Sequence, residues 1–194
     1  RASEAAAVLL VHMPLADEGG LPASEAARLD ALERRTVHAA SRVVATSRTA
    51  AASLARRHGR AGVRVAPPGV TPAPVADVHD PPHLLAVGAI GPRKNQRALV
   101  RALAGLTDLP WHATIVGPVV DDAYAVAVAD AAPPGRVRWT GELGGPELDA
   151  VWAGGDLLVH PSLAETWGMV VTEALARGIP AVVGSGTGAV EALA

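Results

Sequence analysis

The sequence of 194 residues contains no cysteine. Without thiols the chain has no disulfides, no thiolate metal ligands and no cysteine nucleophile. It also lacks an excess of either charge, because 17 Lys and Arg residues are set against 19 Asp and Glu residues. That balance provides no general basic field, so we expect no nucleic-acid partner and only local anion sites.

Long apolar runs are absent too. The longest, Ala5 to Val11, stops at His12 and is far shorter than the roughly 20 residues that span a bilayer. It lacks the basic start and the cleavage site of a signal peptide and is better interpreted as a buried strand. We therefore expect a cytoplasmic protein. Since the chain starts at Arg1 and ends in what resembles the start of a helix, we also expect a piece of a longer protein.

Common metal and phosphate motifs are missing. The seven histidines form no H-E-x-x-H, and G-x-x-x-x-G-K-[ST] occurs nowhere. Asp121-Asp122 and the separate histidines have no ligand spacing and are interpreted as surface or loop residues: His12, His38, His79 and His83. We expect no metal site.

The second part of the chain alternates short apolar runs with helical patterns. Strands are predicted at residues 84–89, 112–117, 137–140, 156–160 and 180–184. Helices are predicted at 96–106, which places Leu99 and Leu103 on one face, and at 146–153, which begins with Pro followed by Glu. Repeated βα units imply an α/β fold with a parallel, Rossmann-like sheet covered by helices on both faces. Ligands of such sheets bind at the carboxyl ends of the strands.

The first part has a different pattern. A strand is predicted at Val8 to His12, then a long Ala-rich helix, a short strand at Arg42 to Thr46 and a helix that ends near His58. The following strand runs into a proline-rich segment that continues neither sheet nor helix, so residues 71–83 are predicted to link two domains.

The loop from Gly88 to Asn95 follows the first strand of the second domain. Glycine lets the backbone approach a ligand, and Arg93 with Lys94 places two cations where the strand ends face the ligand. The loop is therefore either a phosphate site or an ordinary βα connection with solvated basic residues, and spacing alone does not decide between them.

Two glutamates, Glu165 and Glu173, stand eight positions apart around an apolar segment. If Thr166 or Glu165 caps a helix there, the backbone N–H groups of Trp167–Met169 point out of its N-terminus. On one helix the pair would be separated by roughly 12 Å and about 80° of rotation, so the two carboxylates would contact different parts of an extended ligand. The alternative is a capping carboxylate and a salt-bridged glutamate. Nearby, Gly184 to Ala189 fits G-x-G-x-x-[GA] only weakly and is better interpreted as a flexible turn.

Taken together, these motifs resemble the retaining glycosyltransferases of family 4, which have the GT-B architecture. The resemblance covers nearly the whole chain in order: SRVVATS, VGAIGPRKN, IVG, RVRWTGEL, DLLVHPSLAETWGMVVTEALARGIPAVV and GTGAVEAL. Its most specific part is E-x7-E followed by EALA-x-G-x-P, which favours the ligand interpretation of both glutamates. The resemblance implies that residues 1–70 end an acceptor-side domain, that 71–83 link the domains, and that 84–194 are an incomplete nucleotide-sugar domain.

The implied reaction moves a sugar from a UDP- or GDP-sugar to a carbohydrate or glycolipid hydroxyl, with no further cofactor and no metal. The resemblance implies cell-envelope glycan or glycolipid synthesis, with mannosyl or glucosyl transfer, and peripheral membrane contact through the N-terminal domain. Glu173 would bind the ribose hydroxyls, since a carboxylate offers two acceptor oxygens. Lys94, assisted by Arg93, would neutralise the departing diphosphate.

Glu165 and the N–H groups of Trp167, Gly168 and Met169 would face the donor sugar and the diphosphate. His12, at the end of its strand, resembles the family's cleft histidine that contacts the donor sugar. Retention is expected through same-face attack, with the donor phosphate accepting the proton of the acceptor.

One position departs from the family pattern, because Ala89 stands where many members have Arg; Arg93 is a candidate substitute. Two other interpretations stay open: a nucleotide-sugar epimerase on the same fold, and a non-catalytic module that binds nucleotide-sugars.

Overall fold

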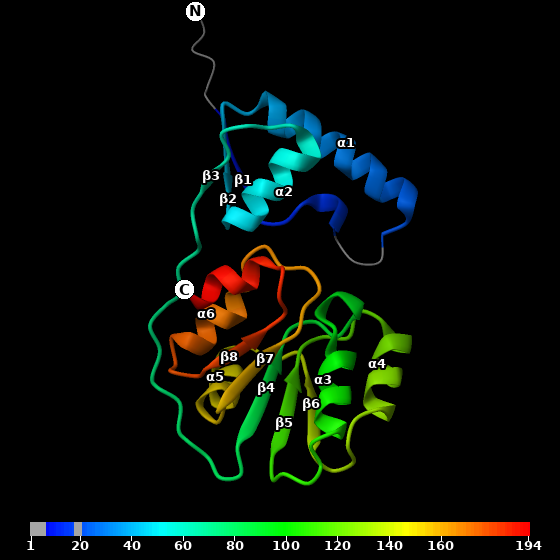
Figure 1. Cartoon of the computed structure of the whole chain (residues 1–194), viewed down its shortest axis with the longest axis vertical. Coiled ribbons are helices and arrows are strands. Elements are labelled where there is room, and N and C mark those ends of the chain that lie inside the picture. The colour runs from blue at the N-terminus through cyan, green and yellow to red at the C-terminus, as the bar shows by residue number, and fades with distance from the viewer. Residues whose placement is uncertain (1–6, 18–20) are drawn as a thin grey trace, which may run out of the picture. The chain divides into compact units, whose positions relative to one another are not determined.

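The computed structural model describes residues 7–17 and 21–194. The chain divides into two compact units (Figure 1). The first comprises residues 1–68 with 165–167, and the second comprises residues 69–164 with 168–194. Each unit is built on its own parallel sheet, so each is described by itself.

The first unit contains a three-stranded parallel sheet in the order β1-β2-β3. Its elements are β1 (Val8–Val11), η1 (Leu15–Asp17), α1 (Ala23–Ala39), β2 (Arg42–Ala45), α2 (Arg48–His58) and β3 (Arg64–Val65). Helix α2 begins after Ser47, whose Oγ accepts a hydrogen bond from the N–H of Ala50 at 2.9 Å. Val37, Val43 and Leu54 are buried in a core between the helices and the sheet. The strands and helices predicted for this region are confirmed.

The second unit contains five parallel strands in the order β6-β5-β4-β7-β8. The strands are β4 (His83–Val87), β5 (His112–Val116), β6 (Val137–Gly141), β7 (Leu157–His160) and β8 (Ala181–Val183). The helices are η2 (Pro92–Lys94), α3 (Gln96–Ala104), α4 (Asp122–Asp130), α5 (Gly145–Ala153), α6 (Met169–Leu175) and η3 (Gly188–Leu193). All five predicted strands form. The chain places β4 centrally, adds β5 and β6 on one side and then β7 and β8 on the other, so the strand order reverses between β4 and β7.

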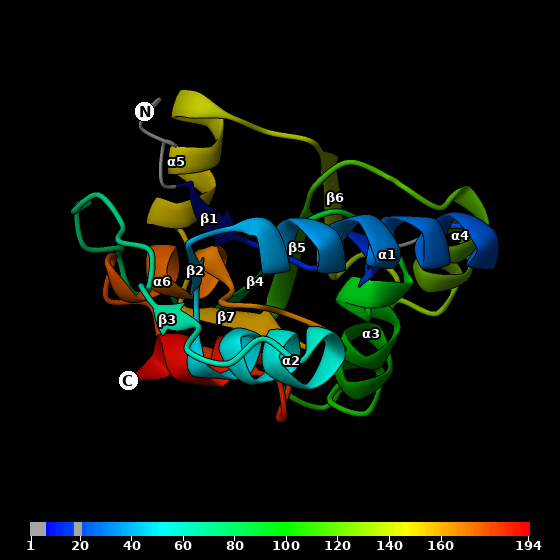
Figure 2. The same ribbon diagram turned by 90° about the horizontal axis from the view of Figure 1, so that it is seen from above.

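Both faces of this sheet are covered. Ala86 and Ile115 belong to a buried cluster with side chains of α3 and α4, and these two helices lie side by side in both views (Figure 1, Figure 2). Leu85, the neighbour of Ala86 on the strand, points to the opposite face because successive side chains alternate. There it packs beside Ile179, near Gly155. The expected α/β fold with helices on both faces is confirmed.

Helix α4 was not among the predicted elements. The carboxylate of Asp121 accepts a hydrogen bond from the N–H of Tyr124 at 2.9 Å, and Asp122 is the first residue of the helix. Asp121 lies in the loop before the helix and Asp122 is exposed, as predicted for surface or loop residues; in addition, Asp121 is an N-cap, because its carboxylate satisfies a backbone donor of the first helical turn.

The proline-rich segment predicted as a linker has no helix or strand, and its later part is bonded to the second unit. The N–H of Ala76 donates to the carbonyl of Arg177 at 2.9 Å, and that of Asp77 donates to the carbonyl of Ala153 at 3.0 Å. The second compact unit accordingly starts at Gly69, before the predicted domain start at residue 84. Among the described residues, no helix combines the length and the apolar character that crossing a membrane requires.

Candidate functional site

The candidate site lies at the carboxyl ends of β4 and β7, where the strand order reverses and a crevice is expected in a sheet of this kind. The two loops that follow these strands are fastened together. The N–H of Leu163 donates to the carbonyl of Arg93 at 2.9 Å, and the side-chain amide of Asn95 donates to the carbonyl of Pro161 at 3.2 Å. The loop predicted from basic residues and the loop that leads to the two glutamates are thus one structural feature.

Lys94 lies over the end of β4. It belongs to the short helix η2, and a Cβ atom built on Gly88 would come within 3.3 Å of the Lys94 Cε and 3.7 Å of its Nζ. Gly88 has a φ of 143°, and its N–H donates to the carbonyl of Val116 at 2.8 Å. The chain turns out of the sheet at Gly88, and the absence of a side chain there leaves room for the lysine. A positive charge therefore lies at the strand end, as the sequence predicted.

Arg93 extends toward the other loop. Its guanidinium donates to the carbonyl of Ala164 at 3.1 Å, so this side chain connects the loop after β4 to the loop after β7. Ala89, where a family arginine is common, is half-buried, and its carbonyl accepts a hydrogen bond from the Gln96 amide at 2.9 Å. In the structure Arg93 joins the loop after β4 to the loop after β7, and its role toward a phosphate stays a prediction.

A hollow of about 330 Å³ opens at the carboxyl ends of β7 and β8. It is lined by Asn95, Val159, Pro161, Ser162, Leu163, Val182, Val183, Gly184 and Ser185. The Oγ of Ser162, one of the lining residues, lies 3.2 Å from the Nε2 of His160, and both residues are buried. Backbone carbonyls, a hydroxyl and an amide are the groups that orient a polar ligand in such a hollow.

The helix that follows these residues starts later than predicted. Helix α6 begins at Met169, and its N-cap is Gly168 with a φ of 86° and no capping side chain. The predicted cap by Thr166 or Glu165 is therefore wrong, as is the helical separation of 12 Å and 80° between the two glutamates. The physical reason is the left-handed turn at Gly168, which redirects the chain immediately before the helix. Of the three N–H groups predicted at the helix start, only that of Met169 belongs to the helix.

Glu173 lies in the second half of α6 and is half-buried. Its backbone carbonyl accepts a hydrogen bond from the Arg177 guanidinium at 3.1 Å. Arg177 also pairs with Asp149 at 3.0 Å and lies over the Trp152 ring at 5.4 Å. Within the described residues, the carboxylate of Glu173 has no hydrogen bond and no ion pair. The helix turn is thus fixed by Arg177, while both carboxylate oxygens stay available to a ligand.

The predicted site residues fall into both units. Lys94, Arg93, Gly168, Met169 and Glu173 belong to the second unit. The remaining predicted residues, His12, Glu165 and Trp167, belong to the first. His12 follows β1 directly and is exposed.

Three features of the site escaped the sequence reasoning. The Asn95 bond depends on which loops meet in space, and no local pattern reveals that. The His160–Ser162 contact joins residues two positions apart at the end of β7, and it depends on how the chain turns there. Arg177 sits inside the EALA-x-G-x-P motif, in the turn that follows α6, and its position four residues after Glu173 places its guanidinium within reach of the Glu173 carbonyl.

Comparison with known proteins gives the chain a family. Residues 72–194 match the model of the family glycosyl transferases group 1. The chain is 34% identical over 179 residues to a D-inositol 3-phosphate glycosyltransferase of Pseudarthrobacter chlorophenolicus, with 81% of this chain and 43% of that protein covered. It is 38% identical over 96 residues to a GDP-mannose-dependent alpha-mannosyltransferase of Mycolicibacterium smegmatis, with 50% and 24% covered. The chain thus spans less than half the length of these relatives.

Solved structures share the fold. Anabaena HepE, in complex with UDP and glucose, has a TM-score of 0.78 at 21% identity, with 95% of this chain and 54% of that chain covered. Sucrose-phosphate synthase of Thermosynechococcus elongatus has a TM-score of 0.75 at 21% identity, with 93% and 50% covered. Both support the GT-B type of architecture with Rossmann-like units. Because the family model also matches more than half of the sequence, the chain belongs to the group 1 glycosyltransferase family.

Proposed function

We propose that the protein is a retaining glycosyltransferase that moves a sugar from a UDP- or GDP-sugar to a hydroxyl of a carbohydrate or glycolipid. The observation that carries the proposal is the arrangement at the reversal of strand order. Lys94 lies over Gly88 at the end of β4, and on α6, the helix that follows β7, the half-buried Glu173 carboxylate has no partner within the described part of the chain. A cation and an uncommitted carboxylate are the groups that a diphosphate and a ribose require.

The chemistry assigned to these residues is electrostatic. The bond between the sugar C1 and the diphosphate oxygen breaks, and its electron pair stays on the leaving diphosphate. Lys94 stabilises that developing charge, which is the general way in which a fixed cation accelerates such a step. The acceptor hydroxyl attacks C1 from the same face and passes its proton to the donor phosphate. No metal is needed for this sequence of bond changes.

The remaining roles follow from the family resemblance. Glu165 and the N–H groups of residues 167–169 face the donor sugar and its phosphates, and His12 contacts the sugar. The names of relatives support a nucleotide-sugar donor, since one uses GDP-mannose and one solved structure holds UDP and glucose.

The decisive test compares two ligands and two proteins. Calorimetry with UDP and with 2′,3′-dideoxy-UDP should show that wild-type protein loses about tenfold or more in affinity when the ribose hydroxyls are removed, because a hydrogen bond to a charged group contributes about 1.5–3 kcal/mol. Glu173→Ala should bind both ligands equally. If GDP is the better ligand, the same comparison is made with its dideoxy form.

The matched control is Glu147→Ala, which removes an exposed glutamate that lines a different hollow together with His83 and Thr114. This variant should discriminate between the two ligands as wild type does. Equal discrimination by Glu173→Ala and wild type would remove Glu173 from the ribose site.

A further inference from the structure

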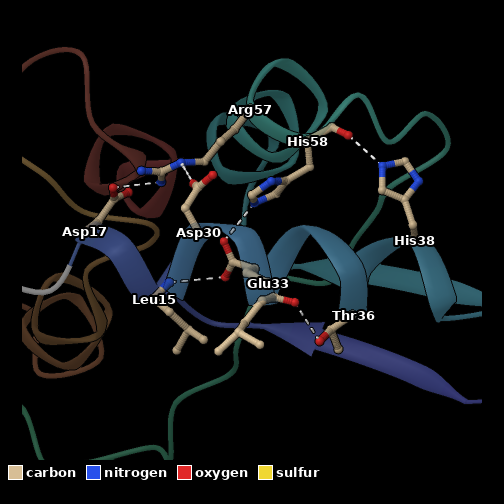
Figure 3. Close-up of polar contacts among 9 residues, drawn as sticks. Leu15, Asp17, Asp30, Glu33, Thr36, His38, Arg57 and His58 are labelled. Carbon is tan, nitrogen blue, oxygen red and sulfur yellow. Dashed lines mark hydrogen bonds and ion pairs between the residues drawn. The ribbon is translucent and has the colours of Figure 1, made fainter. Parts of the chain in front are cut away.

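A buried carboxylate connects three segments of the first unit. Glu33 lies on α1 with 5% of its surface exposed. Its Oε2 is 2.8 Å from the Nε2 of His58, and its Oε1 accepts a hydrogen bond from the N–H of Leu15 at 3.1 Å (Figure 3). A carboxylate removed from water is costly unless its oxygens are paired, and here both are. One of the two partners, the backbone N–H of Leu15, belongs to the short helix η1 rather than to α1 or α2.

His58 gives this carboxylate a fixed donor. It is the last residue of α2 and is 1% exposed, and its backbone carbonyl accepts a hydrogen bond from the Nε2 of His38 at 2.7 Å. A carboxylate only accepts hydrogen bonds, so the Nε2 of His58 donates to Glu33. The two histidines and the glutamate therefore fix the end of α2 against α1, as Figure 3 shows.

A second tether holds the other end of the same loop. Arg57 pairs with Asp17 at 2.7 Å and with Asp30 at 2.6 Å. Asp30 stands one helical turn before Glu33, so both carboxylates lie on the α1 face that meets this loop. Leu15 and Asp17 are the first and last residues of η1. The short helix is thus attached at both ends to the two long helices.

This attachment restrains His12. The preceding residue, Val11, is buried and paired in register with Ala45 of β2. Only residues 12–14 separate that fixed strand end from the tethered N–H of Leu15. Three residues span at most about 10 Å when extended, so a segment held at both ends has little freedom.

We propose that Glu33 is a positioning residue that fixes the direction of the His12 side chain by holding η1. The inference rests on the role proposed above for His12 toward the donor sugar. If Glu33 and His58 served only to pack α1 against α2, a pair of apolar side chains would be sufficient, because such pairs often replace a buried ion pair without loss of stability. The Oε1 of Glu33 instead accepts the hydrogen bond from the N–H of Leu15 and so holds the segment that contains η1.

The test removes the tether without removing the helix. In the full-length protein, Glu33→Ala should raise the hydrogen-exchange rate of the Leu15 amide at least tenfold and should shift or broaden the NMR signals of the His12 ring. Sugar transfer should lose about tenfold or more in kcat, because small displacements of a positioned group are costly, with KM for the donor changed much less. Glu33→Gln retains an oxygen for Leu15 and should restore most of this loss.

Two controls separate positioning from stability. Val37→Ala empties a fully buried position of the same helix. Glu25→Ala removes a partly exposed carboxylate whose ion-pair partner among the described residues is Arg28. Both should leave the His12 signals and kcat unchanged at temperatures well below unfolding. His12 signals in Glu33→Ala that match those of Val37→Ala would overturn the inference, whether or not sugar transfer is detected. A wild-type protein that transfers no sugar would instead refute the proposed function.

Discussion

The two ends of the five-stranded sheet use polar side chains differently. At the amino end, Asp156 precedes β7, and its carboxylate accepts hydrogen bonds from the backbone N–H groups of His79 at 2.8 Å and of His83 at 2.7 Å. The His83 ring contacts the carbonyl of Gly154 at 2.6 Å and the hydroxyl of Thr114 at 2.8 Å. Each of these polar groups has a partner within the described residues, although His83 and Thr114 also line a hollow of about 380 Å³.

The carboxyl-end loops and the helix that follows β7 carry the residues that we propose bind a ligand. Lys94 lies over Gly88, a hollow of about 330 Å³ opens beside β7 and β8, and within the described residues Glu173 leaves its carboxylate unpaired. An uncompensated half-buried acceptor adds nothing to folding stability. We therefore expect the polar residues around Asp156 to contribute mainly to stability, and Lys94 and Glu173 to contribute mainly to the proposed ligand binding. Substitutions at the amino end should therefore lower the free energy of unfolding, whereas substitutions at the carboxyl end should lower ligand affinity or kcat.

The largest effect is expected from Lys94→Ala. Removing a cation from a developing negative charge should lower the kcat of sugar transfer by about 10²- to 10³-fold, with little change in the urea midpoint of unfolding. Arg97→Ala is the control, because it deletes a nearby exposed cation that lies over the Tyr124 ring. It should change kcat less than twofold. Equal losses in both variants would mean that only net charge matters.

Lys94 can also be observed directly. It is the only lysine in the sequence. In the 194-residue chain, reductive methylation with ¹³C-formaldehyde therefore labels this side chain and the terminal amine alone. Addition of UDP should shift the dimethyl-lysine signal, and inorganic sulfate at the same ionic strength should shift it much less.

The next effect concerns stability at the opposite end. Asp156→Ala leaves the N–H groups of His79 and His83 without their acceptor and should lower the free energy of unfolding by about 2–3 kcal/mol. UDP affinity at a temperature where the variant is folded should stay within twofold of wild type. Asp108→Ala, at an exposed position, should change stability by less than about 0.5 kcal/mol. A stable Asp156→Ala protein with weakened UDP binding would reverse the comparison.

The sequence predicted much of the second unit, because apolar runs that alternate with helical patterns are a local signal. The prediction missed α4, whose segment from Ala123 to Ala129 consists of Ala and Val apart from Tyr124 and shows no clear helical periodicity. The predicted start of α6 was wrong, since the sequence alone does not show that Gly168 adopts a φ of 86°. The Glu33–His58 pair joins residues 25 positions apart, so only tertiary structure reveals it.

A smaller effect is expected from Arg93→Ala, which tests whether fastening the two loops matters. The lost bond to the Ala164 carbonyl is exposed, so stability should fall by less than about 1 kcal/mol. UDP affinity should fall by less than tenfold, since the N–H of Leu163 and the Asn95 amide still connect the loops. A loss as large as that of Lys94→Ala would instead assign the phosphate directly to Arg93.

The smallest effect is a pH dependence that belongs to the amino end alone. Burial lowers the pKa of His83, and the neighbouring His112 lowers it further, against the opposing bond to the Gly154 carbonyl. The unfolded chain therefore takes up a proton first as the pH falls below about 6.5, and the stability contributed by neutral His83 is lost through that window. Burial tends to raise the pKa of Asp156, but the N–H bonds from His83 and His79 outweigh it and lower that pKa, so its contribution is lost only below about pH 4.

Urea midpoints measured between pH 7.5 and 5 should fall more steeply in wild type than in His83→Asn, because the variant lacks the group whose protonation favours unfolding. The affinity of Glu173→Ala for UDP relative to wild type should stay constant over this range, since the carboxyl end does not depend on His83. Parallel midpoint curves for wild type and His83→Asn would show that the imidazole does not couple its proton to folding. The stability contributed by the polar contacts of the amino end would then come from the hydrogen bonds that Asp156 accepts from the N–H groups of His79 and His83.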